Sequence, residues 1–321
     1  MPSGGPLAAL SWLGSPVRVG ILGVAVLGLV TLFAALALLP DRGDSRPDVG
    51  IPDASQHTAQ SSAPSASPGT PITAPFDLPI LMYHHIGQEA VADAYPRLTV
   101  SNDEFDAQLA YLQCAGYTTL SVAELFEAIE GQGSLPPKPI ILTFDDGYRS
   151  QYDNALPLLQ KHGFTGSLAV VTGFLSGGGA QYMNWQQLQE MSVAGMEILS
   201  HTVTHRDLGT ISEADLQNEL TASRSELESR TGRRVQFLVY PAGEPFRSGT
   251  AEAQERVLRA VQDAGYRGAL LDSASSTVQD PSTPYQLNRV RVDGGESVDA
   301  FVQSIATANS PADNACRQAS G

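Results

Sequence analysis

Two short motifs in this chain of 321 residues carry side chains that could do chemistry together. Asp145 and Asp146 directly follow an apolar run, and His201 and His205 lie four residues apart in a later segment. Two imidazoles and one carboxylate are a ligand set for a divalent metal such as zinc, which keeps a further position open for water. Neighbouring residues on an extended chain point in opposite directions, so one aspartate can bind the metal while the other acts as a base.

Polar residues also follow two other apolar runs. His84 and His85 end the run PILMY, and Pro241 and Ala242 end the run QFLVY. The carboxyl ends of parallel strands meet at one edge of a sheet, so we expect all four clusters to lie on one face. An Asp-Asp-Gly sequence alone is an ordinary turn, and a lone His-x-x-x-His pair is often only solvated. Their joint occurrence at successive strand ends indicates an active site.

The elements that must position these residues alternate between strand and helix. The strands are continuously apolar, which is typical of a parallel sheet buried on both faces. They are predicted at 79–84, 139–144, 167–171, 196–200, 236–240, 267–271 and 287–292. Capping residues predict helices that begin after Ser101, Ser121, Asn184, Ser212 and Thr250, with a further helix around 151–162.

This alternation predicts an α/β fold, a distorted (β/α) barrel with fewer than eight complete units. An open, doubly wound sheet is the alternative, but no G-x-G-x-x-G motif follows a strand and no P-loop is present. The net charge of -15 lacks the basic footprint of a nucleic-acid-binding protein, so we exclude that class. The sequence leaves open whether its two cysteines, Cys114 and Cys316, form a disulfide.

The N-terminal part of the chain is predicted to lie outside the enzyme fold. Residues 19–39 are uncharged and long enough to cross a bilayer, and Arg18 before them favours a cytoplasmic N-terminus. A cleaved signal peptide is the alternative, and it would make the protein secreted. The expected organisation is a cytoplasmic segment 1–18, an anchor 19–39, a disordered linker 40–75, one exported domain 76–306 and a flexible tail 307–321.

The sequence TFDDG at 143–147, followed by SHTVTH at 200–205, resembles the polysaccharide deacetylase family, also known as the NodB homology domain or carbohydrate esterase family 4. The resemblance runs from about Leu78 to about Ile305. It implies that Asp145 is the general base. It also implies that Asp146, His201 and His205 bind a divalent metal, Zn²⁺ first, with Co²⁺ or Ni²⁺ as alternatives.

The chain departs from the commonest pattern of this family in three places. Val239-Tyr240-Pro241-Ala242-Gly243 stands where the family has Arg-x-Pro-Tyr, and no Asp and Trp pair follows Tyr266. An arginine, Arg289, stands where the family has the histidine of Leu-x-His. These features resemble the branch of poly-N-acetylglucosamine deacetylases, which implies that His84 is the catalytic acid, with His85 as the alternative. The predicted substrate or oxyanion contacts are Tyr240, Pro241, Ala242 and Arg289.

The expected activity is metal-dependent removal of N-acetyl groups from an extracellular or cell-wall polysaccharide of N-acetylhexosamine. The same groups would cleave an O-acetyl ester, as on xylan, so an acetyl esterase is the nearest alternative. A catalytically silent glycan-binding wall protein is the second. The expected partners are a polysaccharide or oligosaccharide and, through the N-terminal helix, a membrane. The protein is expected to be a monomer.

Overall fold

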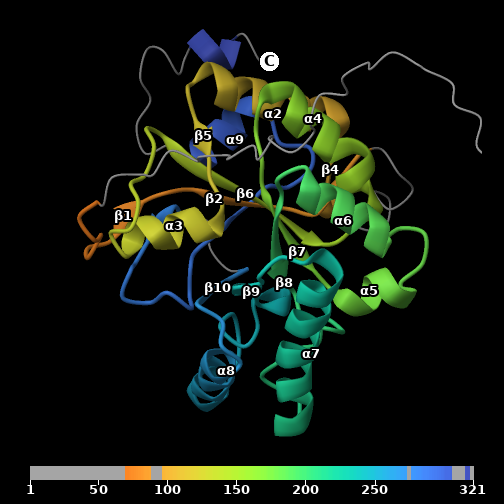
Figure 1. Ribbon diagram of the computed structural model, residues 1–321. Helices are drawn as coiled ribbons and strands as arrows, with labels where there is room; N and C mark the ends of the chain where they lie inside the picture. Colours follow the sequence, from red (N-terminus) through yellow and green to blue (C-terminus); the bar gives the residue numbers. More distant parts are fainter. Residues whose placement is uncertain (1–68, 88–95, 273–275, 306–314, 319–321) are drawn as a thin grey trace, which may run out of the picture. The chain divides into compact units, whose positions relative to one another are not determined.

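The computed structural model describes residues 69–87, 96–272, 276–305 and 315–318 (Figure 1). The chain divides into two compact units, Met1–Ser61 and Ser62–Gly321, and every described residue belongs to the second. The predicted membrane anchor at 19–39 lies outside the described residues. Among the residues that are described, no helix is both long and apolar enough to cross a membrane.

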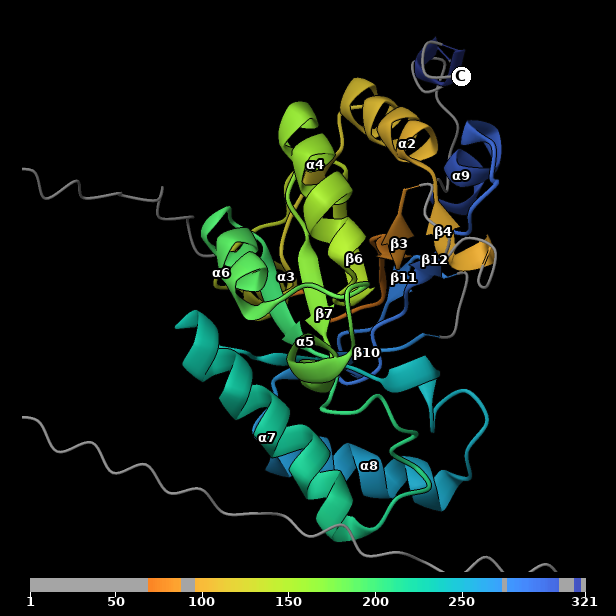
Figure 2. The same ribbon diagram turned by 90° about the vertical axis from the view of Figure 1, so that its right-hand side faces the viewer.

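A curled parallel sheet of eight strands forms the framework of the second unit (Figures 1 and 2). Its order is β10-β9-β8-β7-β6-β2-β12, and β5 pairs with β6 beside this path. All the pairs in this sheet are parallel, as the apolar runs predict. The strands are β2 (Ile80–Tyr83), β5 (Thr118–Thr119), β6 (Pro139–Asp146), β7 (Ser167–Val170), β8 (Glu197–Ser200), β9 (Phe237–Val239), β10 (Gly268–Leu270) and β12 (Val290–Arg291).

The segment before β12 joins the two ends of the sheet. Leu287 forms a parallel bridge with Leu270 of β10. The Leu271 amide donates to the Leu287 carbonyl at 2.9 Å, and the Leu287 amide donates to the Ala269 carbonyl at 3.0 Å. The sheet therefore curls on itself, and the prediction of a distorted (β/α) barrel is confirmed.

Helices connect the strands and begin where the capping residues predict. Ser101, Ser121 and Asn184 each form a capping box with the residue three positions later. The helices are α2 (Asn102–Cys114), α3 (Val122–Ile129), α4 (Leu156–His162), α5 (Thr172–Gly177), α6 (Trp185–Val193), α7 (Glu213–Thr231), α8 (Ala251–Asp263) and α9 (Val298–Ile305). A π-helical turn, Gln151–Ala155, leads into α4.

Short elements complete the fold and were not predicted. Two-residue strands β1 (Phe76–Asp77) and β11 (Val278–Gln279) pair antiparallel. Strand β3 (His85–Ile86) pairs parallel with β4 (Thr99–Val100), which follows a 3-10 turn at Pro96–Leu98. A second 3-10 turn, Pro241–Gly243, follows β9.

Two apolar clusters hold the sheet in place. The larger one contains residues of α2, α4, α6, α7 and α8 and lies between the helices and the outer face of the sheet. The smaller one fills the inner face and takes alternate residues from the strands: Ile80, Ile141, Ala169, Leu199, Val239 and Leu270. Because side chains alternate along β6, Asp145 continues the inner row that includes Ile141.

The structured part of the chain extends beyond the predicted domain at both ends. The Ile72 amide, inside the predicted linker, donates to the Ile129 carbonyl of α3 at 3.0 Å. Cys316, inside the predicted tail, forms a disulfide with Cys114 of α2, with a distance of 5.6 Å between the two Cα atoms. The question of pairing that the sequence left open is therefore answered.

Candidate active site

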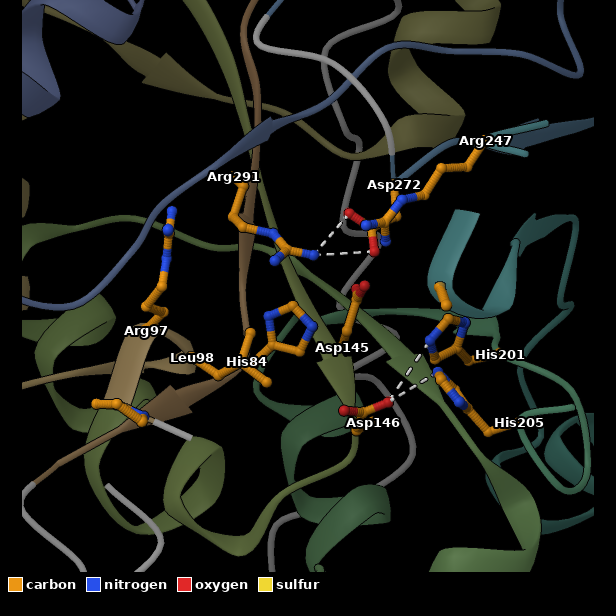
Figure 3. Close-up of a pocket in the computed structure, with 12 residues that line it drawn as sticks. His84, Arg97, Leu98, Asp145, Asp146, His201, His205, Arg247, Asp272 and Arg291 are labelled. Atoms are coloured by element: carbon orange, nitrogen blue, oxygen red, sulfur yellow. Dashed lines mark hydrogen bonds and ion pairs between the residues drawn. The ribbon is translucent and has the colours of Figure 1, made fainter. Parts of the chain in front are cut away.

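A cavity of about 440 Å³ lies at the carboxyl ends of the central strands (Figure 3). It brings together the last residues of β6 and residues that follow β2, β8 and β9, as the position of the motifs predicts. Six of the predicted site residues line it: His84, Asp145, Asp146, His201, His205 and Ala242.

Three of these residues form a possible metal site. Asp146 Oδ1 lies 3.6 Å from His201 Nε2 and 3.5 Å from His205 Nε2 (Figure 3). Within the described part of the chain, this buried oxygen has no hydrogen-bond partner. One ligand atom from each residue lies within 4.8 Å of the others. The residues therefore fit a divalent cation. A buried carboxylate oxygen without a hydrogen-bond partner is unfavourable, and a cation bound between it and the two imidazoles would stabilise it.

His201 is held in the tautomer that a metal ligand needs. Its Nδ1–H donates to the Val239 carbonyl at 2.8 Å, which leaves the lone pair of Nε2 directed at Asp146. Burial, and next the neighbouring His205, lower the pKa of His201 to about 4. The imidazole is therefore neutral near pH 7, as binding to a cation requires.

The loop between the two histidines is held by one buried carboxylate of α7. Glu219 is only 2% exposed and accepts hydrogen bonds from the Val203 and Thr204 amides at 2.8 and 2.9 Å, and from the Thr204 hydroxyl. Thr202 and His205 have positive φ angles of 70° and 59°. Such backbone is strained for residues other than glycine, so the bonds to Glu219 stabilise the conformation that directs His205 at the site.

Asp145 faces the cavity from the inner row of β6 and has a dedicated counter-ion. Arg289 Nη1 and Nη2 donate to its two carboxylate oxygens, each at 2.8 Å. Both side chains are buried. Burial acts to raise the pKa of the Asp145 carboxyl, but the guanidinium of Arg289 outweighs it and holds this pKa well below its usual range. Asp145 is therefore ionised at neutral pH.

The structure gives Arg289 a different place from the predicted substrate contact. It has no exposed surface and is paired with Asp145, although it also borders a second cavity beside the first. Two of its three remaining donors are also bonded, to the Leu271 carbonyl at 2.6 Å and to the Thr143 hydroxyl at 3.0 Å. The physical reason is that a buried carboxylate needs a paired charge, so this arginine is committed inside the barrel.

Of the two neighbouring histidines, His84 is the one in the cavity. The His85 ring is 3% exposed and lies on the Tyr148 ring, with 3.5 Å between ring centroids. Gln151, in the π-helical turn, donates to the His84 carbonyl at 2.9 Å and to the Asp145 carbonyl at 2.5 Å. The turn therefore fixes the end of β2 against the end of β6.

The segment after β9 places one of its three predicted contacts at the cavity. Ala242 lines it with a φ of 50°, an unusual backbone conformation for alanine. Tyr240 has no exposed surface and packs on Phe246, and Pro241 is also buried. The side chains of Tyr240 and Pro241 therefore lie in the core and do not line this cavity.

Four charged residues of the cavity wall were not predicted: Arg97, Arg247, Asp272 and Arg291. Asp272 follows the end of β10 and accepts from Arg291 Nη2 at 3.0 and 3.1 Å. Asp272 directly follows the apolar run RGALL, and the other motifs were identified because they also follow apolar runs. Arg97 and Arg247 come from loops, for which the sequence carries no comparable signal.

A curled parallel barrel with an aspartate pair and a His-x-x-x-His pair at its strand ends defines an α/β-barrel hydrolase class. Residues 132–269 match the profile of the family described as "Polysaccharide deacetylase". This central part of the chain therefore carries a polysaccharide deacetylase domain profile, and the relatives of the chain bear deacetylase names.

Relatives and solved structures agree with this assignment. YxkH of Bacillus subtilis (strain 168) is 29% identical over 227 residues, which cover 71% of this chain and 75% of that protein. The structure of the Streptococcus pyogenes deacetylase PplD in complex with acetate superposes with a TM-score of 0.65 and 27% identity, and covers 72% of this chain and 99% of that chain. The poly-beta-1,6-N-acetyl-D-glucosamine N-deacetylase of Escherichia coli (strain K12) is 29% identical over 136 residues, 38% of this chain but only 20% of that protein.

Proposed function

We propose that this protein hydrolyses N-acetyl groups on a polysaccharide of N-acetylhexosamine. The observation that carries the proposal is the meeting of an ionised Asp145 with the Asp146, His201 and His205 set in one cavity. The names of its relatives, which include an N-acetylglucosamine polymer deacetylase, support an amide as the bond that is cleaved.

The cation that we propose for this set is Zn²⁺, with Co²⁺ or Ni²⁺ as alternatives. Two imidazoles and one carboxylate are a ligand combination that zinc accepts in hydrolases. A divalent cation held there supplies Lewis acidity toward the amide carbonyl and toward water.

Two residues of the chain, Asp145 and His84, then carry out the two proton transfers of the reaction. Asp145, kept ionised by Arg289, accepts the proton of the attacking water. His84, on the same cavity wall, donates a proton to the leaving amine, so that the products are acetate and a free amino sugar. The Ala242 amide is our candidate for the donor that stabilises the oxyanion, because its unusual φ exposes this turn to the cavity.

We further propose that the domain acts outside the cytoplasm, held by residues 19–39 or secreted if that segment is cleaved. The Cys114–Cys316 disulfide supports this location, because such bonds persist in oxidising compartments. The names of its sugar-polymer relatives support a glycan outside the cell as the partner.

The test measures acetate release by the purified full-length protein, stripped of metal and then supplied with Zn²⁺ or Co²⁺. N-acetylglucosamine oligomers and acetylated xylan are the two substrates. Release from the oligomers that needs added metal and is lost in Asp145→Asn and His201→Ala would support the proposal. Release from xylan alone would make the protein an acetyl esterase, and tight metal binding without release would make it a glycan-binding protein.

A further inference from the structure

A second cavity, of about 420 Å³, adjoins the first and shares part of its wall. The residues that line both are Arg97, Arg247, Asp272 and Arg291. Three of these four side chains are guanidinium groups. This junction is therefore locally cationic, in a chain whose net charge is -15.

Two of the three guanidinium groups are paired but keep unused donors. Arg291 uses Nη2 for Asp272, and its other nitrogens form no hydrogen bond with the described residues. Arg97 uses Nε and Nη2 for Asp293, which lines the second cavity only. A guanidinium has five N–H donors, so both can still bind a further acceptor.

Of the three arginines at the junction, Arg247 is the one without a partner in the described part of the chain. Its side chain forms neither a hydrogen bond nor an ion pair with any residue that the structure describes. Figure 3 shows it extending over the cavity toward Asp272, on the opposite side of that carboxylate from Arg291. Asp272 is already bonded to Arg291, so the positive charge of Arg247 remains available at the junction.

The acidic residues Asp293 and Glu296 of the second cavity do not lie on the wall that the two cavities share. Asp293 is occupied by Arg97. Glu296 lines the second cavity but not the first. Guanidinium groups with free donors suit carboxylate and phosphate oxygens, to which they can bind in pairs.

We propose that the junction binds an anionic substituent, a carboxylate or a phosphate, carried by the glycan next to the acetamido group that is hydrolysed. The inference rests on the proposed deacetylase function and specifies its substrate. One cavity is lined by both Arg247 and the Asp146, His201 and His205 set, so a sugar whose acetamido group lies at the set has the arginines within the same cavity.

The experiment compares acetate release by the zinc-loaded full-length protein from three oligosaccharides of equal length. One is neutral N-acetylglucosamine oligomer, one carries the lactyl carboxylate of N-acetylmuramic acid, and one carries 6-phosphate groups. The first variant is Arg247→Gln, and Arg247→Lys is the conservative variant. The control is Arg234→Gln, an exposed arginine between α7 and β9, at the amino end of the sheet.

We expect kcat/KM to be higher for one of the anionic oligosaccharides than for the neutral one, and this preference to weaken with added salt. Arg247→Gln should lower kcat/KM for that anionic glycan roughly tenfold or more, the scale of a charge-assisted hydrogen bond, with little change for the neutral one. Arg247→Lys should keep part of the preference, and Arg234→Gln should behave as wild type. The anionic oligosaccharide that gives the higher kcat/KM shows whether the substituent is a carboxylate or a phosphate.

A wild-type protein without any anion preference would overturn the inference, as would an Arg247→Gln protein that loses activity equally on all three substrates. Acetate release from the neutral oligomer tests the deacetylase proposal separately. If no oligomer releases acetate, calorimetric binding of the same three glycans to the metal-free protein still measures the charge preference. Equal affinity for all three would then refute the anion site.

Discussion

Replacing Arg289 with methionine would leave Asp145 as an unpaired charge inside the barrel. Methionine keeps an unbranched apolar stem but removes the guanidinium, whose two bonds to Asp145 are each 2.8 Å long. Removing one partner of a buried ion pair costs about 3–5 kcal/mol. For a domain of this size, we expect Tm to fall by roughly 6–20 °C near neutral pH.

The pH dependence of this loss has a definite sign. In the wild type, Arg289 outweighs burial and depresses the pKa of Asp145 below the 3.8 of a free aspartate. The pair therefore contributes its stability above about pH 4 and loses it as pH falls through the lower folded value. In Arg289→Met, burial dominates and the pKa of Asp145 rises above that of the unfolded chain. The difference in Tm between the two proteins should then widen as pH rises from about 4 to about 7.

Thermal unfolding across this pH range, with Arg289→Met, Asp145→Asn and the double variant, measures both effects. The double variant removes both charges of this pair, so it should be more stable than Arg289→Met alone. Arg291→Met is the matched control, because its side chain is 37% exposed and its pair with Asp272 should contribute at most about 1 kcal/mol. The reasoning is refuted if Arg289→Met unfolds within about 2 °C of the wild type at neutral pH, or if the double variant shows no recovery.

Three further predictions concern other parts of the site and the fold. Glu219→Ala should weaken Zn²⁺ affinity about tenfold or more, because the loop that carries His205 loses three hydrogen bonds. Competition with a chelator measures this affinity. The control Asp215→Ala, on the exposed side of α7, should leave the affinity unchanged. His84→Ala should lower kcat by a factor of about 10² to 10⁴ with metal affinity unchanged, and a smaller loss than tenfold would exclude it as the acid. Cys316→Ser should lower unfolding stability by about 2–4 kcal/mol without changing kcat/KM, and an unchanged Tm would mean that the disulfide constrains little.

Local patterns were sufficient to predict the framework of the fold. Continuous apolar runs identified the main strands, because a strand covered on both faces has no polar alternation. The caps at Ser101, Ser121 and Asn184 fixed the starts of helices, because each needs only a partner three residues away. Two-residue strands such as β3 and β4 have no such signal, since they form only where neighbouring segments supply a partner.

The residues of the site also include some that the sequence predicts and some that it does not. Asp145, Asp146, His201 and His205 were recognisable because each pair lies within one short motif. The pairing of Arg289 with Asp145 was not, because the two are separated by 144 positions and meet only when the sheet is assembled. Glu219 was missed for a related reason, because the sequence does not reveal that this carboxylate of α7 lies under the histidine loop.

The strand order has a consequence for how the protein reaches its native state. Strand β12, which the chain makes last, pairs with β2, which it makes first among the strands of the main sheet. When synthesis has passed His205, the chain already contains Asp146, His201 and His205. Arg289, which stabilises the charge of Asp145, has not yet been synthesised. Contacts of such high sequence separation slow folding, because a long loop must close before the contact stabilises it. The Asp145 carboxylate is therefore expected to be among the last parts of the molecule to become stable during biosynthesis, because its counter-ion Arg289 comes from the last strand segment.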